Sequence, residues 1–529
     1  MQYLVLIISL FLSPILSANS SDLSASLAQL SDRNNNAKSE AIEKITQSNA
    51  PQTIKILQSL LDGKIYYRKS DKTIFYFYKQ DDGYHLEDVL SGETSIITKK
   101  RGYKKVTINN KLRGKLRQSI ASLQLGNADP SVRKSAVEEI FKKITLENVA
   151  LLKEYLPKEN DVNIKSLMQL ALTISELSSD DDSIALVAIK KLDGNLEPIV
   201  RNTLNQLVEE SDNPTIKAAA QESLKSIKSQ VKFYDHMETL YFGLSLGSVL
   251  ALAGLGLAIT FGVMGVINMA HGELIMIGAY TTYVIQLLMP DSIGTSILVA
   301  IPAAFIVAGL VGILMERTVI RHLYGRPLET LLATFGISLI LQQAVRSIFS
   351  PLNRTVITPE WMSGTLDVNA IFSLTWNRLY IIVFCIMVFI TLIMIMKKTP
   401  LGLQVRAVSQ NRAMARAMGV RSDWVDALTF GLGAGIAGVA GVALSLLTNV
   451  GPNLGQAYII DSFMVVVFGG VGNLWGTLVA GMSLGVINKV LEPWAGAVLA
   501  KILVLIAIIL FIQKRPRGLF PQRGRASEN

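Results

Sequence analysis

The chain has 529 residues, of which 50% are hydrophobic and 17% charged, and its formal net charge is +10. This length exceeds one ordinary domain, and the apolar share favours a membrane-embedded part. A basic balance in a membrane protein usually reflects Lys and Arg held in cytoplasmic loops, so we exclude nucleic acid as a partner. The single cysteine, Cys385, excludes an internal disulfide, and the lack of a His or Cys cluster at ligand spacing predicts no metal site and no cofactor.

Residues 1–18 are predicted to be a signal peptide, with an apolar core from Tyr3 to Leu12 and small residues up to Ala18. No positive charge precedes the core, so an uncleaved anchor is the alternative. Either form exports the segment that follows.

Residues 19–235 are rich in Lys, Asp, Glu, Ser and Asn, and they predict an exported soluble domain of amphipathic helices. Four segments share a polar cap residue, often a Pro at the next position, and then an aliphatic residue and a cation. They are Asp129–Arg133, Asp161–Lys165, Glu197–Arg201 and Asn213–Lys217. This recurrence predicts an irregular helical repeat of HEAT type.

A small antiparallel sheet is predicted near residues 64–108, where β-branched and aromatic residues replace the helical pattern in Ile74–Tyr78 and Thr94–Thr98. Its aromatic side chains either bind a ligand or pack the sheet onto a helix, and packing is the favoured alternative. No Ser/His/Asp set or carboxylate pair predicts catalysis. We therefore expect an interaction module with no catalytic residues, in a protein that is not an enzyme.

Residues 236–525 alternate between long apolar runs and short basic patches, which predicts an all-α polytopic membrane domain. The runs long enough for a crossing or nearly so are 239–262, 273–289, 294–316, 329–349, 379–396, 426–448, 458–470, 474–490 and 497–513. Two of them, 458–470 and 474–490, are short and joined by glycines, so they form either two crossings or a re-entrant pair. The expected number of crossings is seven to nine.

Lys and Arg fix the orientation, because short cytoplasmic loops collect them. One set of loops is rich in cations, while the opposite set contains only Arg354 and Arg378. The basic loops lie near 317–326, 397–421 and 514–525. We therefore expect a multi-pass protein of the plasma (inner) membrane, with the N-terminal domain periplasmic or extracellular and the C-terminus cytoplasmic.

Ionisable residues are rare within the apolar runs, and burying one costs about 2.5–3.5 kcal/mol on insertion scales. The exceptions are His271 and Glu273 at a break between the first two runs, and Arg346, Asp461, Lys489, Glu492 and Lys501 near the ends of later ones. This scarcity favours a neutral or zwitterionic solute that is moved without a bound proton or sodium ion. A gated channel is also compatible with this scarcity of ionisable residues.

The basic loop 397–426 predicts a turn at Thr399–Gly402 and a short helix over Gln410–Met418 that ends at Gly419. A permease inserts such a helix into a groove on an ATPase subunit, whereas the alternative is a solvated positive loop. The candidate coupling residues are Arg406, Arg412, Arg416 and Gly419. The sequence has no G-x-x-x-x-G-K-[ST] phosphate loop, so any ATP hydrolysis belongs to another subunit.

Several segments resemble the branched-chain amino acid permease family of ABC importers. They are Gly256–Glu273 with Ile277–Tyr280, Thr399–Val408 with Ala417–Gly419, Phe430–Gly441 and Phe468–Gly476. The resemblance implies a transmembrane permease subunit that works with ABC ATPase subunits, a second permease subunit and an exported solute-binding protein. The exported N-terminal extension resembles the urea-transport branch and implies urea or short amides as solute. The alternatives are a branched-chain amino acid permease and a gated channel without an ATPase.

Two glycine-interrupted segments predict the substrate path, because unwound backbone offers N–H and C=O groups to a cavity. Phe261–Gly265 precedes Asn268, and Phe468–Gly472 precedes Asn473 in the same way. Urea has a carbonyl acceptor and amide donors, which side-chain amides and a carboxylate complement. The candidate path residues are therefore Asn268, His271, Glu273 and Asn473. The alternative is that His271 and Glu273 cap the second crossing.

Overall fold

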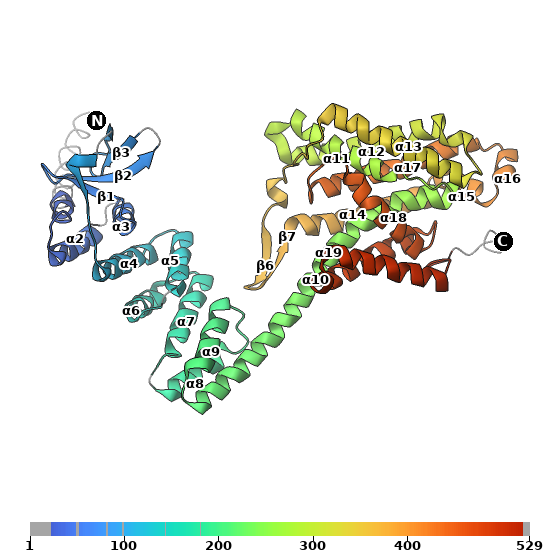
Figure 1. Cartoon of the computed structure of the whole chain (residues 1–529). Helices are drawn as coiled ribbons and strands as arrows, with labels where there is room; N and C mark the ends of the chain where they lie inside the picture. The colour runs from blue at the N-terminus through green and yellow to red at the C-terminus, as the bar shows by residue number, and fades with distance from the viewer. Residues whose placement is uncertain are drawn as a thin grey trace, which may run out of the picture. The chain divides into compact units, whose positions relative to one another are not determined.

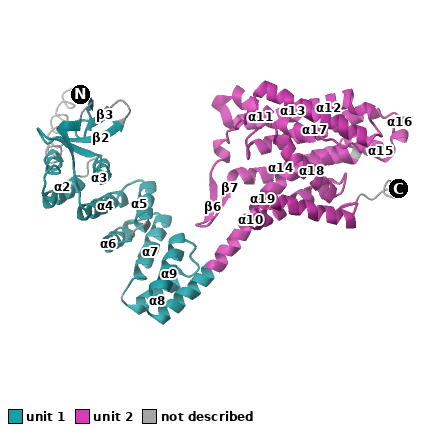
Figure 2. Cartoon of the chain, viewed as in Figure 1, with its two compact units in different colours: residues 1–227 teal, residues 228–529 magenta. Residues whose placement is uncertain are grey.

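The computed structural model describes residues 23–48, 52–80, 83–97, 100–142, 144–179 and 181–521. The chain forms two compact units, residues 1–227 and 228–529 (Figure 2). The predicted signal peptide, residues 1–18, lies outside the described residues. The predicted domain boundary at 235/236 falls inside one long helix, α10 (Pro214–Met264).

The first unit contains the predicted sheet. Its strands are β1 (Ile65–Arg68), β2 (Ile74–Gln80), β3 (Gly83–Asp88), β4 (Thr94–Ile97) and β5 (Tyr103–Lys105). They are all antiparallel in the order β4-β3-β2-β1-β5. One face buries Ile74 and Tyr76 against a core shared with Leu57, Leu60 and Leu116 of the neighbouring helices, as the packing interpretation requires.

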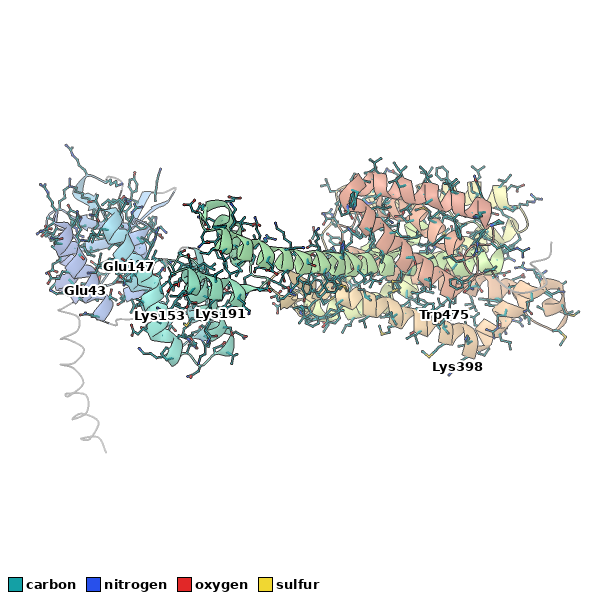
Figure 3. All side chains as sticks on the ribbon, turned by 90° about the horizontal axis from the view of Figure 1, so that it is seen from below. Glu43, Glu147, Lys153, Lys191, Lys398 and Trp475 are labelled. Carbon is teal, nitrogen blue, oxygen red and sulfur yellow. The ribbon has the colours of Figure 1, made fainter. Side chains whose placement is uncertain are left out.

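Helices form the rest of the first unit (Figure 1). They are α2 (Asn35–Gln47), α3 (Thr53–Leu61), α4 (Asn110–Leu125), α5 (Pro130–Lys142), α6 (Leu146–Tyr155), α7 (Val162–Glu176), α8 (Asp182–Leu192) and α9 (Pro198–Glu210). The four predicted helix starts are confirmed, because α5, α9 and α10 begin at a proline and Asp161 caps α7 through two backbone N–H groups. Charged side chains such as Glu43, Glu147, Lys153 and Lys191 are exposed on this unit (Figure 3).

The second unit is a bundle of apolar helices. After α10 it contains α11 (His271–Leu288), α12 (Ile293–Thr318), α13 (Pro327–Phe349), α14 (Trp376–Lys398), α15 (Pro400–Gln410), α16 (Arg412–Ala417), α17 (Ser422–Ser445), α18 (Leu454–Gly469) and α19 (Leu474–Lys514). Among the described residues, six helices are long and apolar enough to cross a membrane, namely α10, α12, α13, α14, α17 and α19. The 16-residue α18 is a shorter apolar helix, and Gly496 interrupts α19 with non-helical backbone angles. The nine predicted apolar runs lie in eight helices, because α19 contains two of them. Six of these helices meet the length and apolarity of a crossing, against the seven to nine crossings expected.

Small residues let the central helices approach closely. A Cβ added to Gly278 of α11 would overlap the carbonyl of Gly438 in α17, and one added to Gly256 would overlap the carbonyl of Gly433. Gly272 and Gly455 make a third contact of this kind, between α11 and α18. In lipid such packing is a main source of helix association, so these glycines have a structural role.

The two ends of the second unit are distinct (Figure 1). The hairpin β6 (Thr365–Asn369) and β7 (Phe372–Thr375) leads directly into α14, and α15 follows the opposite end of that helix. Since α14 has 23 residues, the hairpin and the α15–α16 segment are about 35 Å apart along this helix at 1.5 Å per residue.

Candidate transport site

The predicted break between the first two crossings is present. Helix α10 ends at Met264, Gly265 has a φ of 66°, and α11 begins at His271. A Cβ on Gly262 would overlap the backbone of Gly472, so the two glycine-interrupted segments lie in direct contact. Only glycines permit this approach, because any side chain would push the two backbones apart.

Asn268 and His271 are fully buried at this break. Asn268 Oδ1 accepts a hydrogen bond from the backbone N–H of Ala270 at 3.0 Å, and its Nδ2 has no partner among the described residues. His271 Nε2 donates to the carbonyl oxygen of Ala253 at 2.8 Å, which leaves Nδ1 as the unpartnered nitrogen. The ring therefore anchors α11 to α10 through one nitrogen, and the other nitrogen is buried without a partner among the described residues.

Glu273 is 1% exposed and binds α13. Its Oε1 accepts hydrogen bonds from Ser338 Oγ at 3.0 Å and from Gln342 Nε2 at 2.7 Å. Its Oε2 is buried and has no partner within the described ranges. The capping alternative is wrong, because neither Glu273 nor His271 bonds the free N–H groups of α11, whose first residue follows Ala270 without a side-chain cap.

A polar row on α13 faces this break, and the sequence analysis missed it. The row consists of Thr330, Thr334, Ser338 and Gln342, all of which are at most 5% exposed. Thr334 Oγ1 accepts from the N–H of Met269 at 3.1 Å, so this member of the row contacts the break directly, while Ser338 and Gln342 bond Glu273 in α11. A spacing of four residues within an apolar helix places side chains on one face, and that spacing was the available signal.

Asn473 does not join this cluster as a side chain. It caps α19 by accepting from the N–H of Gly476 at 3.1 Å, and its Nδ2 donates to the carbonyl oxygen of Phe520 at 3.2 Å. Both ends of the amide are therefore used within the fold. Its neighbour Gly472 makes the contact with the first break.

The predicted coupling segment contains two helices. The predicted turn at Thr399–Gly402 is instead the start of α15, because Thr399 Oγ1 accepts from the N–H of Gly402 and Pro400 occupies the first helical position. The predicted short helix is present as α16, and Gly419 follows it with a φ of 89°. An L side chain rarely adopts that backbone angle, which accounts for glycine at this position.

The candidate coupling arginines differ in their contacts. Arg406 Nη1 donates to the carbonyl oxygen of Met396, and Arg412 pairs with the buried Asp426. Arg416 donates to Ser422 and forms an ion pair with Asp423 at 2.8 Å in which both side chains are more than half exposed. Arg412 therefore holds α16 against α17, whereas Arg416 remains accessible.

Tyr324 packs against α16, with the Arg412 guanidinium 4.6 Å from its ring centroid. Its hydroxyl donates to Glu316 Oε1 at 3.2 Å. Burial raises the pKa of Tyr324 far above its usual value, so the phenol stays protonated. It therefore acts as a neutral hydrogen-bond donor here.

No group of three His, Cys, Asp or Glu side chains that would suit a metal ion occurs in the part of the chain that the structure describes. Cys385 is a buried free thiol in α14.

Comparison with known proteins assigns the second unit. Residues 239–512 match the family described as branched-chain amino acid transport system / permease component. The high-affinity branched-chain amino acid transport permease BraD of Pseudomonas aeruginosa is 30% identical over 297 residues, which are 54% of this chain and 96% of BraD. LivH of Escherichia coli K12 is 29% identical, with the same coverage of the two chains. The ribose import permease RbsC of Bacillus subtilis is 28% identical over 137 residues, or 24% of this chain and 42% of RbsC.

No solved structure matches the chain significantly. The matched region contains the α10–α11 break, the α15–α16 segment and the glycine contacts of α17. The chain therefore belongs to the branched-chain amino acid transport permease family.

Proposed function

We propose that this chain is one permease half of an ATP-driven importer for a small solute that carries N–H donors. The observation that carries the proposal is a set of three buried polar atoms without partners at the α10–α11 break and the start of α11. Asn268, His271 and Glu273 each keep one buried polar atom without a partner in the described ranges. Leaving such atoms unpaired costs about 1–3 kcal/mol each, which a protein tolerates where a ligand completes the set.

The chemistry of these atoms defines the solute. Asn268 Nδ2 is a donor that suits a carbonyl or carboxylate oxygen, while Glu273 Oε2 and His271 Nδ1 are acceptors that suit N–H groups. Substrate paths at interrupted helices use such groups together with the unwound backbone. A small amide or an amino acid satisfies both kinds of group.

Two solutes meet these requirements. Urea and short amides are supported by these donor and acceptor atoms and by the exported N-terminal extension that the sequence predicts. Branched-chain amino acids are supported by the relatives, since BraD and LivH are both named as permeases for them.

The α15–α16 segment is the proposed contact with an ATPase subunit. Its outer face exposes Leu403, Met414 and Met418 by 60% or more, next to the accessible Arg416. An apolar centre with a charged rim is the usual composition of a protein interface. Arg406, Arg412 and Gly419 then stabilise the conformation of the segment itself.

The remaining proposals follow from the basic loops. With α15, α16 and the C-terminal tail in the cytoplasm, the N-terminal unit lies outside the plasma (inner) membrane. In this arrangement the HEAT-like domain is exported, and an exported solute-binding protein delivers the solute to the outer side of the membrane. A second permease subunit supplies the other half of the pathway.

The test of this function is uptake by cells or vesicles that contain the complete transporter. Labelled urea and labelled leucine are supplied separately and then in competition, with and without an intact ATPase. ATP-dependent uptake of either solute supports the importer, whereas uptake that persists without ATP hydrolysis supports the gated channel. If neither solute is taken up, the proposed solute class is wrong.

A further inference from the structure

A run of positive charge joins the sheet of the first unit to helix α4. Residues 94–128 contain nine Lys and Arg residues and no Asp or Glu. The run includes β5, which is an edge strand of the sheet, and the first turns of α4. Neither the α10–α11 break nor the α15–α16 segment uses these charges.

Four cations of this run are exposed and unpaired. They are Lys104 and Lys105 on β5 and Lys111 and Arg113 on α4, and we call them the basic surface. The ion pairs of the described residues leave all four without an acidic partner, whereas the nearby Lys115 is bound to a glutamate at 2.9 Å. Their charges are therefore available to a molecule outside the chain.

Lys38 of α2 adds a fifth cation at the same edge of the unit. Its Nζ donates to the carbonyl oxygen of Thr107, between β5 and α4, at 2.6 Å. Burial lowers the pKa of Lys38, the charge of Asp32 opposes this effect, and the charge of Lys104 lowers the pKa further. The ammonium groups of Lys38 and Lys104 therefore repel each other, and Asp32 neutralises at most one of them.

Stability of the fold does not account for this concentration of charge. The first turn of α4 contains Lys111 and Arg113 and no acidic residue, although the N-terminus of a helix favours negative charge. Lysines on an edge strand protect a sheet from pairing with another chain, which explains Lys104 and Lys105 but not the cations of α4. An anionic partner would relieve the repulsion at both places.

The layout of the basic surface suits a layer of anions better than a single ion. Lys105 and Lys111 are six residues apart in the chain, a span of at most about 21 Å. The charges are thus spread over a strand and a helix start. A lysine carries its charge on a flexible stem, so it can follow anionic groups that move, as lipid headgroups do in a bilayer.

A bilayer is also the partner that the chain itself brings close. Helix α10 contains residues of both units and joins the first unit to the membrane-spanning helices. Each Lys or Arg near an anionic bilayer strengthens binding by about fivefold, so four of them strengthen it by several hundred-fold. For a tethered module at millimolar effective concentration, that modest affinity is sufficient.

We propose that the basic surface is a docking site for anionic phospholipid headgroups of the membrane that holds the second unit. The attraction is electrostatic, because the side chains that form the surface are all cationic. The proposal is independent of the solute and of ATP-driven transport. An acidic surface on another exported protein is the rival partner.

Amine labelling of the full chain in lipid nanodiscs tests the proposal. One set of discs contains phosphatidylcholine alone, and the other contains an equal mixture of phosphatidylcholine and phosphatidylglycerol. We expect the anionic discs to lower the labelling of Lys104, Lys105 and Lys111 about fivefold. Salt at 1 M should restore the labelling, because it shortens the Debye length to about 3 Å.

Internal controls come from exposed lysines elsewhere on the first unit. Lys153 of α6 and Lys190 of α8 should be labelled equally in both kinds of disc. Equal labelling of the three lysines of the basic surface in neutral and anionic discs overturns the proposal. Equal protection of the control lysines overturns it too, because the attraction would then come from the net charge of the unit.

A neutralised variant tests the same surface by vesicle binding. The full chain in phosphatidylcholine discs is mixed with sedimenting vesicles that contain phosphatidylglycerol. Combining the four changes should weaken sedimentation at least tenfold, whereas a matched control that removes four exposed lysines elsewhere on the first unit should bind as the wild type does. The variant combines Lys104→Gln, Lys105→Gln, Lys111→Gln and Arg113→Gln, and the control combines Lys153→Gln, Lys165→Gln, Lys190→Gln and Lys225→Gln.

Stability and the rival partner are separated by two further measurements. Removing two cations from the first turn of α4 should leave the melting temperature unchanged or higher, so weaker binding by a stable variant supports the proposal. If the variant fails to fold, the labelling of the wild type decides the question. Normal vesicle binding by the variant, with loss of a co-purifying exported solute-binding protein, would identify a protein interface and overturn the lipid assignment.

Discussion

Replacing Glu273 with Gln separates the structural role of this side chain from its proposed role in transport. Its Oε1 accepts from Ser338 and Gln342, and the amide oxygen of a Gln can accept the same two hydrogen bonds. The substitution changes Oε2, the atom without a partner among the described residues, from an acceptor into a donor. We therefore expect folding to survive and solute binding to fail.

The structure sets the size of both effects. Retaining the two hydrogen bonds should keep the change in the free energy of unfolding within about 1 kcal/mol. Losing one hydrogen bond between a charged group and the solute should lower uptake efficiency by about 10- to 100-fold. In contrast, Glu273→Ala leaves Ser338 and Gln342 unpaired in a buried position, which costs about 1–3 kcal/mol for each group.

The assay measures ATP-dependent uptake and melting temperature for the wild type, Glu273→Gln and Glu273→Ala in the same membranes. The expected pattern is normal stability with poor uptake for Glu273→Gln, and poor stability for Glu273→Ala. Normal uptake by Glu273→Gln at normal expression removes this residue from the solute path. Equal destabilisation in both variants shows that the carboxylate charge itself stabilises the bundle.

Three further predictions address packing, coupling and pH. Gly278→Ala introduces a Cβ that overlaps the backbone of α17 and should lower the free energy of unfolding by about 1–3 kcal/mol, whereas Gly336→Ala, with open space at that position, should be neutral or stabilising in the same thermal melts. Arg416→Glu reverses an exposed charge on α16 and should reduce co-purification of the ATPase about tenfold, while full recovery would favour a solvated loop. Hydrogen bonding from Arg133 holds the pKa of Glu159 below its ordinary value of 4.5, against the effect of burial. The ionised Glu159 therefore stabilises the fold above pH 4.5, and this stabilisation is lost as the pH falls through the lower folded-state pKa. Calorimetry of the wild type and of Glu159→Gln from pH 7 to pH 3 should show this loss only in the wild type.

Local signals predicted much of the fold. Helix starts at Pro130, Asp161 and Pro198 follow from caps and prolines that act within one turn. The same kind of signal misled at Thr399, because a polar residue followed by proline is common both to turns and to helix starts. The helix forms there because Gly402 donates its N–H to the Thr399 hydroxyl.

Long-range contacts limit how much of the candidate site can be predicted from the sequence. The break and its glycines were predicted, but Ser338 and Gln342 lie 65 and 69 residues from Glu273, and no local pattern pairs them. Asn473 shows the opposite error. It was chosen by its parallel with Asn268, yet in the structure its amide caps α19 and binds the C-terminal segment.

Accumulation of solute against a gradient tests the central claim most directly. The complete transporter, with this chain as one permease half, is reconstituted in vesicles with its ATPase subunits, and labelled leucine and urea are supplied in separate experiments at equal concentrations on both sides of the membrane. The permease account predicts that ATP raises the concentration of one of these solutes on the receiving side of the membrane above its concentration on the opposite side. A non-hydrolysable ATP analogue should produce no such accumulation. Equilibration of the solute at the same rate without ATP hydrolysis would contradict it and identify the bundle as a channel.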